Sequence, residues 1–160
     1  MITINLICVG GLKEDYFRAA SKEYEKRLGT MCKLTVTEIP PAPLPQEPSD
    51  AQIAAALEKE AELISKKLAA NAVTYAMCIE GKQRGSEQLA AEFERYAIGG
   101  KSAFNFIIGS SYGLAERIKS AADLRLSMSE MTFPHRLARI MLLEQIYRAL
   151  SINAGSKYHK

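Results

Sequence analysis

The chain has 160 residues, of which 48% are hydrophobic and 24% charged, and its formal net charge at pH 7 is +3. This length suits one domain with a substantial core, and the composition is ordinary for a globular protein. No apolar run is long enough to cross a bilayer, which excludes a helical membrane protein. The segment Met1–Val9 lacks the basic leader and cleavage site of a signal peptide, so we expect a cytoplasmic protein.

The first half of the chain alternates between strand-like and helical patterns. Residues 2–9 are rich in β-branched side chains and predict a strand, and residues 15–28 carry a helical apolar stripe. Residues 33–39 alternate with period two and predict a second strand. The prolines of residues 40–48 predict a stiff loop, and a capping box then opens a helix over residues 49–70.

The alternation continues in the second half. Residues 72–79 predict a third strand, and residues 86–98 predict a helix that stops at two glycines. Residues 103–108 form a fourth predicted strand, followed by a short helix over 114–122 and a weak strand over 123–129. Strands that alternate with helices indicate an α/β fold, a parallel sheet with helices on both faces.

The last predicted helix, residues 134–150, is apolar around nearly its whole circumference. Such a helix has to be buried on more than one side. The sheet accounts for one side, and a second copy of the chain is the simplest cover for the other, so we expect a homodimer. Glu144 and Arg148 interrupt this pattern and are four residues apart. They either form a stabilising ion pair within the helix or are a solvated pair of small effect.

Cysteine and histidine usage gives no indication of a metal site or a disulfide. Cys8, Cys32 and Cys78 are far apart in sequence, and we interpret them as small buried hydrophobes in a reducing compartment. His135 and His159 are the two histidines, too few for a metal site with cysteines so dispersed.

Three loops follow the carboxyl ends of predicted strands, where open parallel sheets bind ligands. They are residues 78–85, 107–114 and 126–135. In the second loop, Gly109 and Gly113 either let the backbone approach a ligand closely or only form a tight turn.

The third loop combines soft apolar side chains with hydroxyls. Met128, Met131 and Phe133 suit the faces of an adenine, although they equally suit gaps in the core. Charge is also uneven: residues 101–160 carry 9 basic and 4 acidic side chains, against 12 and 14 in residues 1–100. An anionic partner would meet the C-terminal third, although uneven charge is common in small domains.

Five segments together resemble the pseudouridine-N3 methyltransferases of large-subunit ribosomal RNA, a family of the SPOUT (α/β-knot) class. They are "ICVGGLKEDYFRAASKEYEKRL", "IEGKQRGSEQLA", "FIIGSSYGL", "LSMSEMTFPHRLARIMLLEQIYRA" and the closing "YHK". The resemblance spans essentially the whole chain. It departs at Ser110, where we expect a second glycine of the family.

The resemblance implies one SPOUT domain over residues 1–160 without a separate RNA-binding domain, and a C-terminal trefoil knot, a rare exception to unknotted topology. It implies a homodimer that binds S-adenosyl-L-methionine and methylates N3 of a pseudouridine in large-subunit (23S) rRNA, within the assembled ribosome. No metal and no membrane take part. The implied cofactor contacts are Met77, Gly109, Met128, Ser129, Glu130, Met131, Thr132 and Phe133.

The implied reaction needs removal of the imide proton from N3 of the base, because that nitrogen has to attack the methyl group. No catalytic carboxylate or histidine dyad is evident in the sequence. The candidate catalytic residues are therefore Tyr158, to stack on or orient the base, His159, to assist deprotonation, and Lys160, to hold a phosphate. A frayed terminus is the alternative interpretation of these residues.

Two other functions stay open on the sequence. One is a SPOUT methyltransferase with another RNA acceptor, and the other is a ribosome-binding protein that has lost catalysis. A generic α/β hydrolase is not favoured, because no Ser-His-Asp spacing of that class is evident in the sequence.

Overall fold

Five strands and five helices alternate along the chain in a computed structural model that describes all 160 residues. The order of the elements confirms the alternation predicted from the sequence. In chain order they are β1 (Thr3–Val9), α1 (Asp15–Leu28), β2 (Lys33–Ile39), α2 (Asp50–Ser65), β3 (Val73–Gln83), α3 (Ser86–Ile98), β4 (Ala103–Ile108), α4 (Glu116–Ala121), β5 (Leu124–Ser127) and α5 (His135–Asn153).

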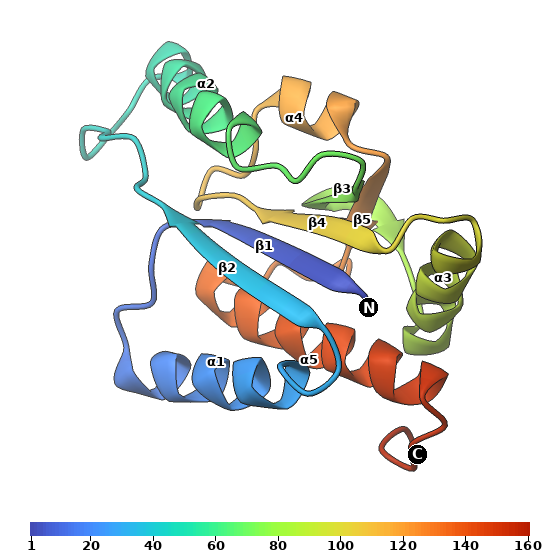
Figure 1. Cartoon of the computed structure of the whole chain (residues 1–160). Helices are drawn as coiled ribbons and strands as arrows, with labels where there is room; N and C mark the ends of the chain where they lie inside the picture. Colours follow the sequence, from blue (N-terminus) through green and yellow to red (C-terminus); the bar gives the residue numbers. More distant parts are fainter.

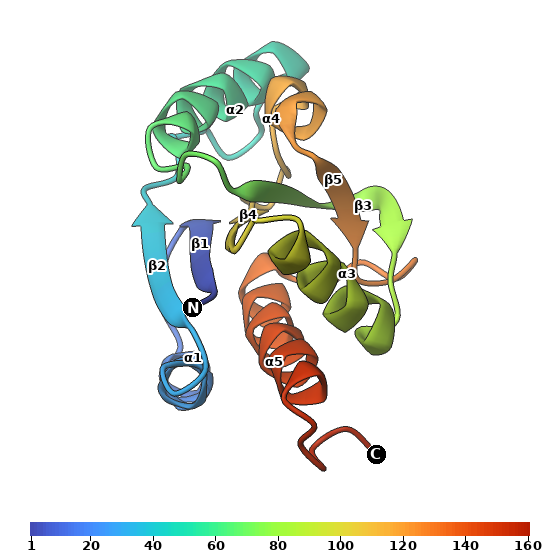
Figure 2. The ribbon, with the colours of Figure 1, turned by 45° about the vertical axis from the view of Figure 1, so that its right-hand side comes forward.

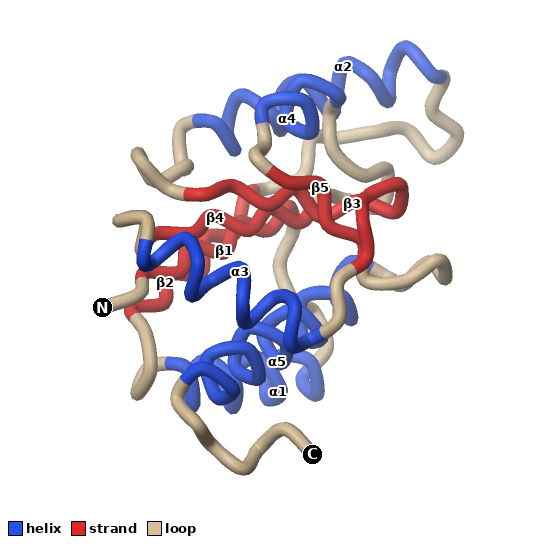
Figure 3. The backbone as a smooth tube through the Cα atoms, turned by 90° about the vertical axis from the view of Figure 1, so that its right-hand side faces the viewer, coloured by secondary structure: helices blue, strands red, loops and turns tan.

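The strands form one parallel sheet in the order β2-β1-β4-β3-β5. Helices α2 and α4 cover one face, and α1, α3 and α5 cover the other (Figures 1 and 3). This three-layer arrangement confirms the predicted α/β sheet with helices on both faces. The knotted crossing of the C-terminal segment stays a prediction.

Each face of the sheet has its own hydrophobic core. The core beneath α1, α3 and α5 is the larger and holds an aromatic group in which Tyr75 stacks on Phe106 with ring centroids 4.7 Å apart. Phe93 of α3 packs against both of these rings. Burial of large aromatic side chains is the main stabilising contribution in such a core.

Helix α2 ends at Ser65, although the sequence pattern predicts that it continues to Ala70. The buried side chain of Asn105 in β4 explains the early end. Its Oδ1 accepts from the backbone N–H of Ala69 at 3.0 Å, and its Nδ2 donates to the carbonyl oxygen of the same residue at 3.2 Å. Because these bonds occupy the backbone groups of Ala69, that residue cannot continue a helix.

Strand β3 runs to Gln83, four residues beyond its predicted end at Ile79. The extra length comes from a bulge, since Met77 and Lys82 both pair with Leu126 of β5. Gly81 allows this close approach: a Cβ there would lie 2.7 Å from the carbonyl carbon of Leu126. A glycine that the sequence suggests as the end of the strand therefore lies inside it.

Helix α5 lies between α1 and α3 beneath the sheet (Figure 2). The chain thus covers this helix on three sides by itself, and its apolar circumference alone does not require a second copy. A ridge of partly exposed side chains remains along its length, including Leu137, Met141 and Tyr147. No helix of the chain is both long and apolar enough to cross a membrane.

Candidate active site

The three loops singled out in the sequence meet at one edge of the sheet. Strands β4, β3 and β5 are neighbours and parallel, so the segments that follow them leave the sheet side by side. This edge is where an open parallel sheet places its ligands.

A pocket of about 560 Å³ opens beside β3 and β5 on the side of α3 and α5. This volume is in the range of small-molecule sites, and more than half of the lining residues are hydrophobic. Two predicted cofactor contacts, Met77 and Met128, lie in its wall. The full lining is Tyr24, Met77, Arg84, Gly85, Ser86, Leu89, Leu126, Ser127, Met128, Ile140, Met141, Leu142, Glu144 and Gln145.

Gly109 is buried at the end of β4, in a turn closed by the Gly113 N–H, which donates to the Ser110 carbonyl at 2.9 Å. A Cβ on Gly109 would overlap the carbonyl oxygen of Gly113. The sequence leaves open whether Gly109 and Gly113 form a tight turn or allow close approach of a ligand. The structure shows the tight turn. Gly109 does not line the pocket and lies in the loop next to it.

The segment from Ser129 to Phe133 continues from the pocket wall without lining it. The Ser127 hydroxyl donates to the Ser129 carbonyl at 3.0 Å, and the Met131 N–H donates to the Ser129 hydroxyl at 3.0 Å. Met131 is 73% exposed, and Glu130 and Thr132 are also exposed, while Phe133 is half-buried. The interpretation of Met131 as a core residue is therefore wrong.

The C-terminal tail is packed against α5 and is not frayed. The Tyr158 hydroxyl donates to Glu144 Oε1 at 3.1 Å, and the Tyr158 ring meets that of Tyr147 edge-on with centroids 4.8 Å apart. Arg148 lies over the Tyr158 ring and its Nη1 is 3.3 Å from His159 Nδ1. Burial and the hydrogen bond to Glu144 raise the pKa of Tyr158, so its hydroxyl stays protonated at neutral pH. Lys160 is exposed.

Glu144 connects the tail to the pocket, because its side chain lines the pocket and also accepts from Tyr158. Arg148 holds this carboxylate with Nη2 2.5 Å from Oε1. Neither Glu144 nor Arg148 is among the site residues predicted from the sequence. Their spacing of four residues was the available signal, but a pair of this kind on a helix is usually only a surface ion pair.

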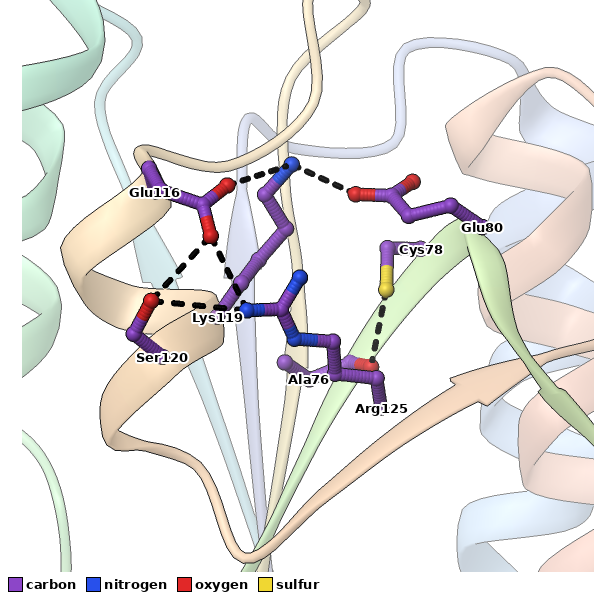
Figure 4. Close-up of polar contacts among 7 residues, drawn as sticks. All are labelled: Ala76, Cys78, Glu80, Glu116, Lys119, Ser120 and Arg125. Carbon is purple, nitrogen blue, oxygen red and sulfur yellow. Dashed lines mark hydrogen bonds and ion pairs between the residues drawn. The ribbon is translucent and has the colours of Figure 1, made fainter.

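A network of charges fixes the bulge of β3 to α4 (Figure 4). Lys119 Nζ lies 2.6 Å from Glu80 Oε1 and 3.5 Å from Glu116 Oε2. Arg125 Nη2 of β5 lies 2.9 Å from Glu116 Oε1. On the opposite side, the Ser86 hydroxyl donates to Gln145 of α5 at 2.6 Å. Glu80 in the bulge and Ser86 at the start of α3 are thus held on opposite faces of the sheet, next to the pocket wall at Met77.

The cysteines give no reactive centre. Cys8 and Cys32 are buried as predicted, and burial raises the pKa of the Cys8 thiol to about 12 and that of Cys32 to about 11. Cys78 is only half-buried in the bulge. No group of three or more His, Cys, Asp or Glu side chains is placed to hold a metal ion.

Residues 2–159 match a family model described as a predicted SPOUT methyltransferase. The chain belongs to this family. The resemblance found in the sequence is confirmed, and with it the assignment as a methyltransferase enzyme. Membership also implies a methyl-donor cofactor of the S-adenosylmethionine type.

Known relatives cover almost the whole chain. A protein of Bifidobacterium adolescentis named ribosomal RNA large subunit methyltransferase H is 49% identical over 157 residues, 98% of this chain and 99% of the relative. A protein of the same name from Exiguobacterium sibiricum is 46% identical over the same shares. Among solved structures, a probable methylase family protein from Haemophilus influenzae aligns with a TM-score of 0.52 at 11% identity, covering 99% of this chain and 70% of that one. This last likeness supports the fold alone.

The residues around the pocket fit a methyl donor that carries a nucleoside. Thioether and aliphatic side chains from Met77, Leu126 and Met128 offer apolar walls for a flat base. Ser127 and Glu144 add polar groups on the same lining.

Proposed function

We propose that this chain transfers a methyl group from S-adenosyl-L-methionine to N3 of a pseudouridine in large-subunit ribosomal RNA, on the assembled ribosome in the cytoplasm. The supporting observation is the pair of relatives at 46% and 49% identity, each aligned over nearly its entire length and each named as a large-subunit rRNA methyltransferase. The pocket lined by Met77 and Met128 is an argument for cofactor binding. The tail packed beside it is an argument that the acceptor base binds there.

In the proposed complex, Met77 and Met128 hold the adenine, and the segment Ser129–Phe133 lies along the cofactor with Gly109 in the neighbouring loop. The bound cofactor supplies an activated methyl group. The protein therefore has to align the acceptor nitrogen with that group and to exclude competing geometries.

The tail residues complete the site in this proposal, since Tyr158 is packed against Glu144 of the pocket lining. Tyr158, protonated and fixed by Glu144, orients the uracil ring. His159 assists loss of the N3 proton, and its Nδ1 lies beside Arg148. Lys160 is exposed and is assigned to an RNA phosphate.

We also propose that the active form is a homodimer that pairs through the outer ridge of α5. The partly exposed Leu137 and Met141 supply apolar surface there, and the tail contacts Tyr147 of the same ridge through Tyr158. A symmetric pairing would bring the tail of each copy close to the second copy.

Sedimentation tests the dimer. We expect the wild-type chain to sediment at micromolar concentration with twice its monomer mass of 17.7 kDa. Leu137→Asp should weaken association at least about tenfold, because it buries an unpaired charge. Ile98→Asp, at an 82% exposed position at the end of α3, is the matched control and should remain dimeric. A monomeric wild type would contradict the proposal.

Transfer of labelled methyl groups tests the function. Purified protein is incubated with methyl-labelled S-adenosyl-L-methionine and either ribosomes from cells lacking the gene or free rRNA from the same cells. We expect label in large-subunit rRNA, mainly in the ribosome sample. Label confined to another RNA would favour a different acceptor. Cofactor and ribosome binding without transfer would favour a non-catalytic protein.

A further inference from the structure

Aromatic rings and guanidinium groups meet on the surface shared by α1, α5 and the tail. This surface, here called the aromatic platform, consists of Tyr24, Arg27, Tyr147, Arg148 and Tyr158. The Tyr147 ring centroid lies 6.5 Å from that of Tyr24 and 4.8 Å from that of Tyr158. Three of the four contacts between a cation and an aromatic ring in this chain belong to the platform. Since one such contact per about 70–80 residues is usual, their concentration here is unusual.

Arg27 is the outer layer of the platform. Its guanidinium carbon lies 5.6 Å from the Tyr24 ring centroid and 5.8 Å from that of Tyr147, and its side chain is 41% exposed. Its Nε donates to Glu23 Oε1 at 2.7 Å, one turn earlier in α1, while its two Nη atoms donate to no other group of the chain. The guanidinium is therefore fixed in orientation and still has free donors, which suits a planar or anionic ligand.

The platform continues the wall of the pocket described above. Tyr24 lines that pocket, and so does Glu144, which accepts from both Arg148 and Tyr158. The surface thus begins at the pocket and extends outward to Arg27. A chain-like ligand with one unit in the pocket or beside the tail would have its next unit over the platform.

The chemistry of the acceptor indicates what that neighbouring unit is. N3 of a uracil ring lies on the edge that forms Watson–Crick pairs, so the acceptor nucleotide has to be unpaired when it is methylated. Unpaired RNA exposes the faces of its bases, and proteins recognise such bases by stacking aromatic rings and arginine planes on them.

We propose that Arg27, supported by Tyr24 and Tyr147, stacks on the base of an unpaired RNA nucleotide next to the acceptor. This inference rests on the proposed function, since it takes RNA to be the acceptor molecule. Contact with a second copy of the chain is the other use of such a surface. The proposed dimer residues Leu137 and Met141 lie roughly 15 and 9 Å from Tyr147 along α5, at 1.5 Å per residue, so the platform lies beyond them.

Ribosome binding by the full-length protein tests the proposal. Ribosomes from cells lacking the gene are the probe, cosedimentation gives the dissociation constant, and initial rates give KM and kcat. Arg27→Ala should raise the dissociation constant and KM at least about tenfold, the effect of one lost stacked base. Arg27→Lys keeps the charge without the plane, so it should stay weakened at least about threefold. The kcat at saturating ribosomes and the affinity for S-adenosyl-L-methionine should stay within about twofold of wild type.

Lys26→Ala is the matched control, because it removes an exposed cation from the same helix turn that lies over no aromatic ring. It should bind ribosomes within about twofold of wild type. Wild-type ribosome affinity in Arg27→Ala would overturn the proposal. Full recovery in Arg27→Lys would also overturn it, since charge alone would then account for the contact.

Sedimentation of the same variants separates an RNA contact from a contact between copies. Arg27→Ala should sediment like the wild-type chain, and loss of self-association in this variant would overturn the proposal. The proposed function and this inference can also fail separately. A wild-type protein that binds ribosomes without transferring methyl groups would contradict the function, while weakened binding by Arg27→Ala would still support the RNA contact. Absence of ribosome binding by the wild-type protein would contradict both.

Discussion

A chain that lacks Tyr158, His159 and Lys160 is expected to fold and to bind the cofactor nearly normally, but to transfer methyl groups to ribosomes at least about a hundredfold more slowly. Loss of a positioned proton acceptor alone accounts for a factor of this size. The tail contacts α5 through the Tyr158 hydrogen bond, its edge-on ring contact and the Arg148 side chain, which lies over the Tyr158 ring and beside His159, so its removal should cost about 1–3 kcal/mol of stability.

Single variants assign this loss to individual side chains. Tyr158→Phe keeps the ring against Tyr147 and removes the bond to Glu144, whereas His159→Ala removes the titratable group. Lys157→Ala, at an exposed position of the same tail, is the control. Single-turnover transfer, circular dichroism and calorimetry are measured on each protein. A truncated enzyme that transfers methyl groups at close to the wild-type rate would place the chemistry elsewhere.

The second large effect is expected for Gly109→Ala, which should weaken binding of S-adenosyl-L-methionine at least about tenfold. The added Cβ would overlap the Gly113 carbonyl oxygen and come within 3.0 Å of the Leu114 side chain. The turn has to open to accept it, at a cost of about 1–3 kcal/mol, and the loop beside the pocket moves with it.

Gly99→Ala provides the matched control for this substitution. Its Cβ would lie 3.4 Å from the nearest backbone atom at an ordinary φ of −74°, at the end of α3. Calorimetry on both variants gives the two affinities, and thermal unfolding checks the fold. Equal affinities for Gly109→Ala and wild type would show that the turn after β4 is not part of the cofactor site.

The elements and their order could be predicted from the sequence because apolar periodicity reports which face of a strand or helix is buried. The exceptions depend on tertiary contacts that no local pattern contains. Helix α2 stops early because Asn105, distant in sequence, binds the backbone of Ala69, and β3 continues through Gly81 because β5 pairs with both sides of the bulge.

The sequence likewise predicts some residues of the candidate site and misses others. Met77 and Met128 came from the family resemblance, and the structure places both in one pocket wall. Glu144 was not predicted, since its connection between tail and pocket appears only when the tail is packed against α5. The covering of α5 by α1 and α3 could not be foreseen from its own apolar pattern, which reports burial but not the identity of the neighbour.

Mass-spectrometric mapping of ribosomal RNA tests the central claim most directly. Large-subunit rRNA is compared from cells with the gene, without it, and without it but supplied with either the full-length chain or the chain truncated after Lys157. The proposed function predicts one N3-methylated pseudouridine that is lost with the gene, restored by the full-length chain and not by the truncated one. An unchanged set of modified nucleotides in cells lacking the gene would contradict it.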